Sequence, residues 1–157
     1  MRSRVFIAAS LLVLGALNYL VWQKEQVLAG GRTVILALAP RDPRSLMQGD
    51  YMTMTYAISA DVPTDAPDTG RLVLRLDNRG IGTFQRVYTD GAPITPDEAL
   101  LRYRRRQWRV LIGAEDYFFQ EGQAQKFAEA RYGELKVSPA GEAILVGLCN
   151  AEAQRIR

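Results

Sequence analysis

The side chains that could do chemistry in this sequence are carboxylates and hydroxyls, because the chain has no histidine and a single cysteine. Zinc and haem sites and histidine-based triads are therefore not expected, and we predict neither a metal nor a cofactor. Two carboxylates that share a site push their pKa values apart and can divide acid and base roles. Asp50 with Glu115 or Glu121 could form such a pair, and Ser45 could act as a nucleophile. The sequence alone does not bring these residues together, so we assign no catalytic residue and favour a non-enzymatic role.

One of these carboxylates, Asp50, lies in a stretch that combines a turn, a Gly-Asp corner and a strand, DPRSLMQGDYMTMTY over residues 42–56. Pro43 fixes its own φ, and the side chain of Asp42 can cap the turn. Gly49 suits a positive φ or a close backbone approach. From Tyr51 the residues alternate with period two, which predicts a strand whose apolar face carries Met52, Met54, Tyr56 and Ile58.

The segment GDYMTMTY, Gly49–Tyr56, resembles the signature of the GDYXXLXY protein family. Met54 stands where that pattern has leucine, which is a volume-conserving exchange of one apolar residue for another. The resemblance includes the turn at 42–44 and continues in the distal half, at residues 101–104, 113–115, 121–122 and 130–135. It implies a membrane-anchored protein that accompanies a multi-pass membrane protein, and it implies no catalytic residue.

A second cluster of candidate binding residues is a run of arginines in the expected strand 101–112. Arg102, Arg104 and Arg106 would share one face of that strand. They form either a solvated sheet face or an anion-binding stripe for lipid headgroups or an acidic partner. Gly49-Asp50 is likewise either a structural corner or part of a binding surface. The candidate binding residues are Asp42, Arg44, Gly49, Asp50, Tyr51, Tyr56, Arg102, Arg104 and Glu121.

Residues 5–22 form an apolar run in which Asn18 is the one strongly polar residue. Its length suits a transmembrane signal-anchor helix of about 20 residues. Arg2 and Arg4 precede it, so residues 1–4 are predicted to be cytoplasmic. A linker at 23–32 would follow, and residues 33–157 would form an extracytoplasmic domain, periplasmic in a cell with two membranes. A signal peptide cleaved between Ala29 and Gly30 is the alternative.

Charge argues against a nucleic-acid ligand. The sequence has 20 basic and 17 acidic residues, and two of the basic residues lie in the first four positions. The remainder has 20 − 2 = 18 basic against 17 acidic groups. A nucleic-acid-binding domain usually has a strongly basic surface.

The pattern of the soluble part predicts an α+β, β-rich domain with a mainly antiparallel sheet. Expected strands cover 33–39, 51–58, 71–76, 81–88, 101–112, 134–137 and 142–148, with a hairpin turn at 77–80. One short helix is expected at 121–131, anchored by Phe127 and ended by Gly133. Cys149 is expected to be a small core residue.

These observations favour a single-span, membrane-anchored accessory protein whose partners are the lipid bilayer, through residues 5–22, and a multi-pass membrane protein. The alternative is a membrane-surface hydrolase or an envelope-ligand-binding protein that uses Asp50 with Glu115 or Glu121, or Ser45. Pro43, Leu46 and Gly49-Asp50 are faintly similar to the active-site stretch of type I signal peptidases. Those enzymes need a serine just before the proline and a lysine base, whereas Asp42 precedes Pro43 here, so serine–lysine chemistry is not expected.

Overall fold

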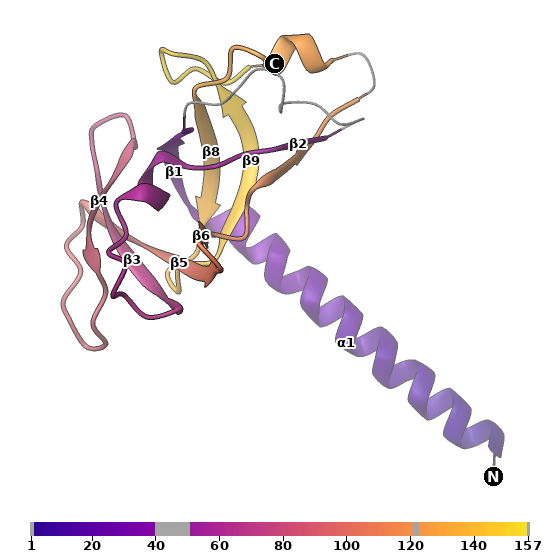
Figure 1. The fold of residues 1–157 in the computed structure, drawn as a ribbon. Helices are drawn as coiled ribbons and strands as arrows, with labels where there is room; N and C mark the ends of the chain where they lie inside the picture. The colour runs from indigo at the N-terminus through magenta and orange to yellow at the C-terminus, as the bar shows by residue number, and fades with distance from the viewer. Residues whose placement is uncertain (1, 40–50, 121–122, 157) are drawn as a thin grey trace.

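The computed structural model describes residues 2–39, 51–120 and 123–156, without the side chains of residues 2–5, 8, 51 and 124. A long helix, α1 (Arg2–Gly30), leads into a β-rich domain, and α1 projects away from that domain with its N-terminus at the far end (Figure 1). The paired strands are antiparallel. This confirms the expected β-rich α+β class with antiparallel sheets.

Within the described residues the strands form three sheets. The central sheet has the order β1-β8-β9, from β1 (Arg32–Ala37), β8 (Tyr132–Val137) and β9 (Ala143–Cys149). The second has the order β4-β3-β5-β6, from β4 (Gly82–Val87), β3 (Thr69–Leu76), β5 (Glu98–Arg106) and β6 (Arg109–Leu111). The third is a ribbon of β2 (Tyr51–Thr53) and β7 (Asp116–Phe118). Two 3₁₀ helices, η2 (Ala57–Ala60) and η3 (Ala124–Phe127), complete the elements.

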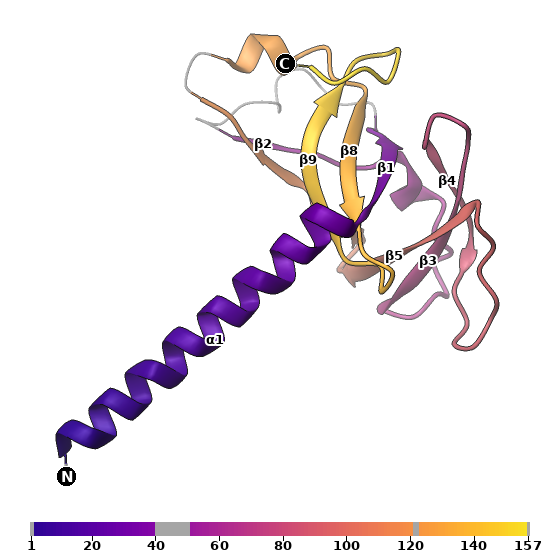
Figure 2. The same cartoon turned by 180° about the vertical axis from the view of Figure 1, so that it is seen from behind.

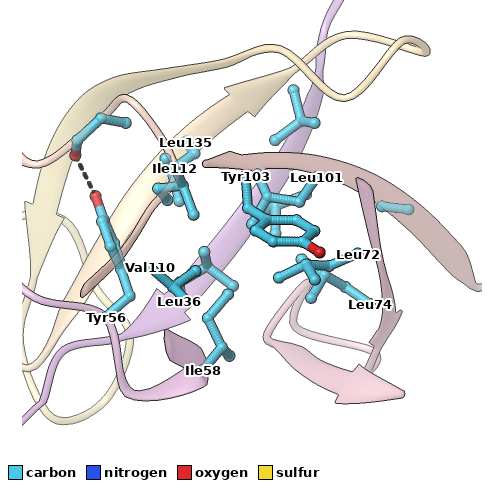
Figure 3. Packing of buried hydrophobic residues seen from close by; sticks show 14 of the residues in the cluster. Leu36, Tyr56, Ile58, Leu72, Leu74, Leu101, Tyr103, Val110, Ile112 and Leu135 are labelled. Atoms are coloured by element: carbon cyan, nitrogen blue, oxygen red, sulfur yellow. Dashed lines mark hydrogen bonds between the residues drawn. The ribbon is translucent and has the colours of Figure 1, made fainter. Parts of the chain in front are cut away.

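Apolar side chains from the first two sheets form the main core. Figure 3 shows part of this cluster, which includes Leu36, Tyr56, Leu72, Leu74, Leu101, Tyr103 and Leu135. A smaller cluster next to the β2–β7 ribbon contains Met52, Met54, Phe127 and Leu148. Burial of these side chains is the main stabilising term of the domain, at about 25 cal/mol per Å² of apolar surface removed from water.

The alternation expected over residues 52–58 is confirmed by burial, although the strand itself is shorter. Met52, Met54, Tyr56 and Ile58 are all buried. β2 ends at Thr53 because the backbone then changes its pairing partners. The amide of Met54 donates to the carbonyl oxygen of Glu115, and the next carbonyl, of Thr55, accepts from Ala39. The chain then turns into η2.

The helix expected at 121–131 is wrong. The described part of this segment has one 3₁₀ turn, η3, and Phe127 is buried as predicted. A longer helix is prevented because Arg131 is already paired on both sides with extended chain. Its amide donates to the carbonyl oxygen of Cys149, and its carbonyl accepts from the amide of Leu38. Gly133 is therefore not a helix cap but a residue of β8.

Helix α1 continues through residues 23–30, the segment expected to be a linker. Its end is packed on the domain, since Val27 is buried and its carbonyl accepts from the amide of Gly31. Figure 2 shows α1 passing directly into β1. Among the residues that the structure describes, no helix combines the length and the apolar content needed to cross a membrane.

The connection between η2 and β3 is organised by Arg105. The guanidinium of Arg105 donates to the carbonyl oxygens of Pro63 at 2.6 Å, Thr64 at 2.7 Å and Ala66 at 3.0 Å. Arginine suits this role because its planar group carries five donors in a fixed geometry. The loop is therefore tied to the inner side of β5.

The predicted hairpin turn at 77–80 is confirmed between β3 and β4. Asp77 Oδ1 accepts from the amides of Arg79 and Ile81, each at 2.8 Å, and Gly80 has a φ of +80°. These hydrogen bonds, first that from Ile81, lower the pKa of Asp77.

Candidate functional site

Most of the predicted Gly-Asp corner lies outside the described residues. This applies to Asp42, Arg44, Gly49 and Asp50, as well as to the alternative nucleophile Ser45 and the candidate acid Glu121. The backbone of Tyr51 begins β2 and pairs with Phe118, but its side chain is not described. The convergence of these residues on one surface therefore stays a prediction.

Tyr56, another candidate binding residue, is a core residue with a satisfied hydroxyl. Its side chain is 1% exposed and its hydroxyl donates to the carbonyl oxygen of Ala114 at 2.6 Å, as Figure 3 shows. Burial, and secondarily the negative charge of Glu115, raises the pKa of Tyr56. The hydroxyl therefore stays protonated and links the segment after β2 to the segment before β7.

The described carboxylates of the candidate site serve local structure. Glu115 Oε1 accepts from the amides of Ile112 at 2.5 Å and Gly113 at 3.1 Å, which holds the turn after β6. Asp116 Oδ1 accepts from the hydroxyl of Thr53 at 2.8 Å, across the β2–β7 ribbon. In the described ranges no cluster of three or more His, Cys, Asp or Glu side chains is suited to hold a metal ion.

The arginine cluster is the part of the predicted site that the structure assembles. Arg102, Arg104 and Arg106 alternate with buried or half-buried residues along β5 and share its exposed face, as the spacing predicted. Directly opposite residues of antiparallel strands lie on the same face. Arg71 of β3 is opposite Arg102, and Arg109 of β6 is opposite Arg106. We call this set of five the arginine face.

Charge compensation is unequal along the arginine face. At one end Arg71 forms an ion pair with Asp90, and Arg102 Nη1 lies 3.2 Å from Glu142 Oε1. At the other end, Arg104, Arg106 and Arg109 form no ion pair with any described residue. Like charges placed directly opposite each other on neighbouring strands are destabilising, and Arg106 and Arg109 form such a pair.

The uncompensated end of the arginine face coincides with the tip of the β5–β6 hairpin. Arg106 pairs with Arg109, which leaves Gln107 and Trp108 as a two-residue loop. Trp108 is 96% exposed. Gln107 has a φ of +54°, a left-handed conformation that costs a non-glycine residue about 1–2 kcal/mol. The turn thus exposes the Trp108 side chain to solvent, and Trp108 lies in the chain between Arg106 and Arg109.

A hollow of about 600 Å³ lies at the compensated end of the arginine face. Its lining includes Arg71, Tyr88, Asp90, Arg102 and Tyr103. The guanidinium of Arg71 lies 4.6 Å from the centre of the Tyr88 ring, a cation–π contact, while it also pairs with Asp90. This hollow could not be predicted from the sequence, because Arg71 lies in β3 while Tyr88 follows the end of β4, and neither residue belongs to a motif.

At the start of β5, at the opposite end of this strand from the hairpin tip, Glu98 has a structural role. Arg86 Nη1 donates to Glu98 Oε1 at 2.5 Å, and Glu98 Oε2 accepts from the amide of Thr95 at 3.1 Å. The hydrogen bond from Arg86, and secondarily that from Thr95, lowers the pKa of Glu98 to about 2. Glu98 is therefore ionised at neutral pH and is unsuited to act as a general base there.

Fold and site together define an antiparallel β domain on a long N-terminal helix, with an arginine-rich sheet face. The model of the family described as GDYXXLXY protein matches residues 13–148. Because this match covers most of the chain, the chain belongs to the GDYXXLXY protein family. No curated protein and no solved structure matches the chain.

Proposed function

We propose that this chain is a single-span membrane protein whose β domain lies outside the cytoplasm, and that it acts as a non-catalytic accessory subunit of a multi-pass membrane protein. Residues 5–22 would cross the bilayer, residues 1–4 would be cytoplasmic, and the domain would be periplasmic in a cell with two membranes. The proposal concerns location and assembly, and it assigns no reaction.

The observation that carries the proposal is the exposure of apolar side chains around α1. Large hydrophobic side chains of this helix are more than half exposed from Phe6 to Trp22, among them Leu12 at 73%. A helix that packs on a soluble domain has an apolar stripe and a polar face, whereas a helix that is apolar on all sides requires an apolar surrounding. The packed part of α1 lies beyond this run, at Val27. A bilayer provides the missing surrounding for the exposed part.

The ends of the run fit a membrane interface. Tyr19 and Trp22 stack with ring centres 6.0 Å apart, and such aromatic residues gather at the level of lipid headgroups. The run includes Val5 and Ala8, whose side chains lie outside the described set, so this support rests on the sequence and on the exposed residues.

Extraction of membranes at high pH tests the anchor. Wild-type protein should stay in the membrane pellet. Leu12→Arg places a charge near the centre of the run, which costs about 2.5–3.5 kcal/mol, so a large fraction should become extractable. Leu28→Arg is the matched control, because Leu28 is exposed on α1 beyond the run and its replacement should leave the protein in the pellet. Full extraction of wild type would overturn the proposal.

The orientation of the domain relative to the membrane can be tested by thiol labelling, because the natural cysteine, Cys149, should react little with the label. Cys149 is 1% exposed, and burial raises the pKa of its thiol, which lowers its reactivity. An added cysteine at the exposed position Asp65 should react with a membrane-impermeant maleimide in cells whose outer barrier is opened. Labelling that requires lysis of the inner membrane would reverse the proposed orientation.

Two features support an accessory role. Asn18 Nδ2 donates to the carbonyl oxygen of Leu14 at 2.9 Å, which leaves the side-chain oxygen of Asn18 able to accept a hydrogen bond from another helix in the bilayer. Outside the bilayer, the Gly-Asp corner is the candidate contact, through Arg44, Asp50 and Tyr51.

Co-purification from native membranes in mild detergent tests the partner. A multi-pass protein enriched with wild type should be lost with Asp50→Ala and kept with Asp65→Ala, which removes the same charge from an exposed loop. If no partner is enriched with wild type, or if Asp50→Ala keeps it, the accessory role or its assigned surface is wrong. Of the residues that the hydrolase alternative would use, Glu115 accepts hydrogen bonds from the turn after β6, and Asp50, Ser45 and Glu121 lie outside the described residues.

A further inference from the structure

The β5–β6 hairpin is fixed to the side of the domain from which α1 leaves. Glu142 connects the two elements, since its carboxylate lies 3.9 Å from Lys24 Nζ of α1 and 3.2 Å from Arg102 Nη1 of β5. A backbone hydrogen bond of 2.7 Å, from the amide of Arg102 to the carbonyl oxygen of Gly141, strengthens the connection. Figure 1 shows the β5–β6 end beside the domain end of α1.

This connection sets the level of the hairpin relative to a bilayer. Lys24 comes two residues after Trp22, so it lies roughly 3 Å further along the helix axis, at 1.5 Å per residue. The headgroup region on each side of a bilayer is about 5–7 Å thick. With residues 5–22 in the hydrocarbon core, Lys24 is therefore at headgroup level. From Arg102, β5 continues to Arg106 at the hairpin end, which Figure 1 shows near the domain end of α1.

The chemistry of the hairpin tip matches an anionic headgroup layer. Arg104, Arg106 and Arg109 carry positive charges that no described carboxylate compensates, whereas Arg71 and Arg102 further back are paired. Guanidinium groups bind phosphate through paired hydrogen bonds. Trp108 is almost fully exposed between them, and tryptophan is the side chain that most favours the membrane interface.

From this geometry we propose that the tip of the β5–β6 hairpin binds the headgroups of anionic phospholipids in the outer leaflet of the membrane that holds α1. Trp108 enters the interface, and Arg104, Arg106 and Arg109 contact lipid phosphates. The inference rests on the proposed membrane anchor and adds a second, electrostatic contact with the bilayer. An acidic protein would meet the same charges. A lipid surface is favoured because the tip lies on the side of the domain where α1 leaves.

The two tryptophans of the chain allow the anchor and the hairpin to be measured separately. Full-length Trp22→Phe retains Trp108 as its single fluorophore, and full-length Trp108→Phe retains Trp22. Each protein is reconstituted in phosphatidylcholine vesicles with and without phosphatidylglycerol. Quenching is measured with nitroxide labels on the headgroup or deep in the acyl chain.

We expect the headgroup label to quench Trp108 when phosphatidylglycerol is present, and the same label to quench Trp22, at the interfacial end of the anchor, in both lipids. Adding Arg104→Gln and Arg106→Gln should weaken the Trp108 contact roughly fivefold per arginine, from about 1 kcal/mol each. The matched control is Arg75→Gln with Arg79→Gln, which removes the same charge from the end of β3 and from the turn that follows it, and should leave quenching unchanged.

Each contrary result has a separate meaning. Quenching of Trp22 without quenching of Trp108 overturns the hairpin contact and leaves the anchor standing. No quenching of Trp22 overturns the anchor, and with it this inference. Equal quenching of Trp108 in both lipids overturns the charge-based part. A photo-crosslinker at Trp108 that captures a protein in native membranes, without quenching in vesicles, replaces the lipid with an acidic protein partner.

Discussion

A double-mutant cycle between Tyr56 and Gly133 tests the assignment of Tyr56 to the core. Tyr56→Phe removes the donor to the buried carbonyl oxygen of Ala114, and an unsatisfied buried acceptor costs about 1–3 kcal/mol. A Cβ atom on Gly133 would lie 3.0 Å from Cε1 and 3.2 Å from the hydroxyl oxygen of Tyr56, and 3.3 Å from Cδ1 of Leu145. Gly133→Ala overpacks this site, at a cost of about 1–3 kcal/mol.

The two changes should not add. Without the hydroxyl, one of the two close contacts on the Tyr56 ring disappears, so Gly133→Ala should cost less in the Tyr56→Phe background. We expect the loss in unfolding free energy of the double variant to be smaller than the sum of the two single losses by about 0.5 kcal/mol or more, as is usual for residues in contact.

The assay is urea unfolding of the full chain in mild detergent, followed by circular dichroism of the β structure. Stabilities are compared only if the urea dependence is unchanged between variants. Tyr88→Phe is the control. It also removes a tyrosine hydroxyl, but Tyr88 is half-exposed, so this change should cost no more than about 0.5 kcal/mol of stability. A neutral Tyr56→Phe, or strict additivity in the cycle, would refute the packing described here.

Three further predictions concern the second sheet. Glu98→Gln should remove a pH dependence, because the pKa of Glu98 is lowered from 4.5 to about 2, chiefly by Arg86. In the wild type the ionised Glu98 stabilises the fold above pH 4.5, and this stabilisation is lost as the pH falls toward 2. The urea midpoint of the wild type should therefore fall more steeply between pH 4.5 and 2 than that of Glu98→Gln. An equal pH dependence of the two midpoints would contradict the assignment. Arg105→Lys leaves one ammonium group for the three carbonyl oxygens of the loop at 63–66 that Arg105 binds, which should cost roughly 1–2 kcal/mol of local stability. Protease cleavage in this loop should therefore become about tenfold faster. Unchanged cleavage would show that the loop does not depend on Arg105. Gln107→Gly should relieve the left-handed turn and raise the melting temperature by about 2–4 °C, whereas an unchanged or lower temperature would mean that the turn is unstrained.

Local patterns were sufficient for much of the fold. The alternation from Met52 to Ile58 predicted which side chains are buried, because the period of a strand is fixed by its backbone geometry. The hairpin at 77–80 was equally predictable, since the Asp77 side chain bonds amides two and four residues away. The shared face of Arg102 and Arg104 followed from the same period.

Features set by distant partners could not be read from the sequence. The helix expected around Phe127 fails because Arg131 pairs with Cys149 and Leu38, and neither contact has a local signal. Arg105 looked like one more charge in a run, yet its bonding partners lie 39–42 residues away. The unequal pairing of the arginine face has the same cause, because Asp90 lies between β4 and β5 and Glu142 lies between β8 and β9.

The continuity of α1 with the domain has a mechanical consequence. Only Gly31 separates the end of the helix from β1, while Val27 is buried and Lys24 is paired with Glu142. The helix and the domain are therefore expected to move together as one rigid body. If α1 crosses a bilayer as proposed, a neighbouring helix that tilts α1 would also reorient the whole domain, without any contact to the domain itself.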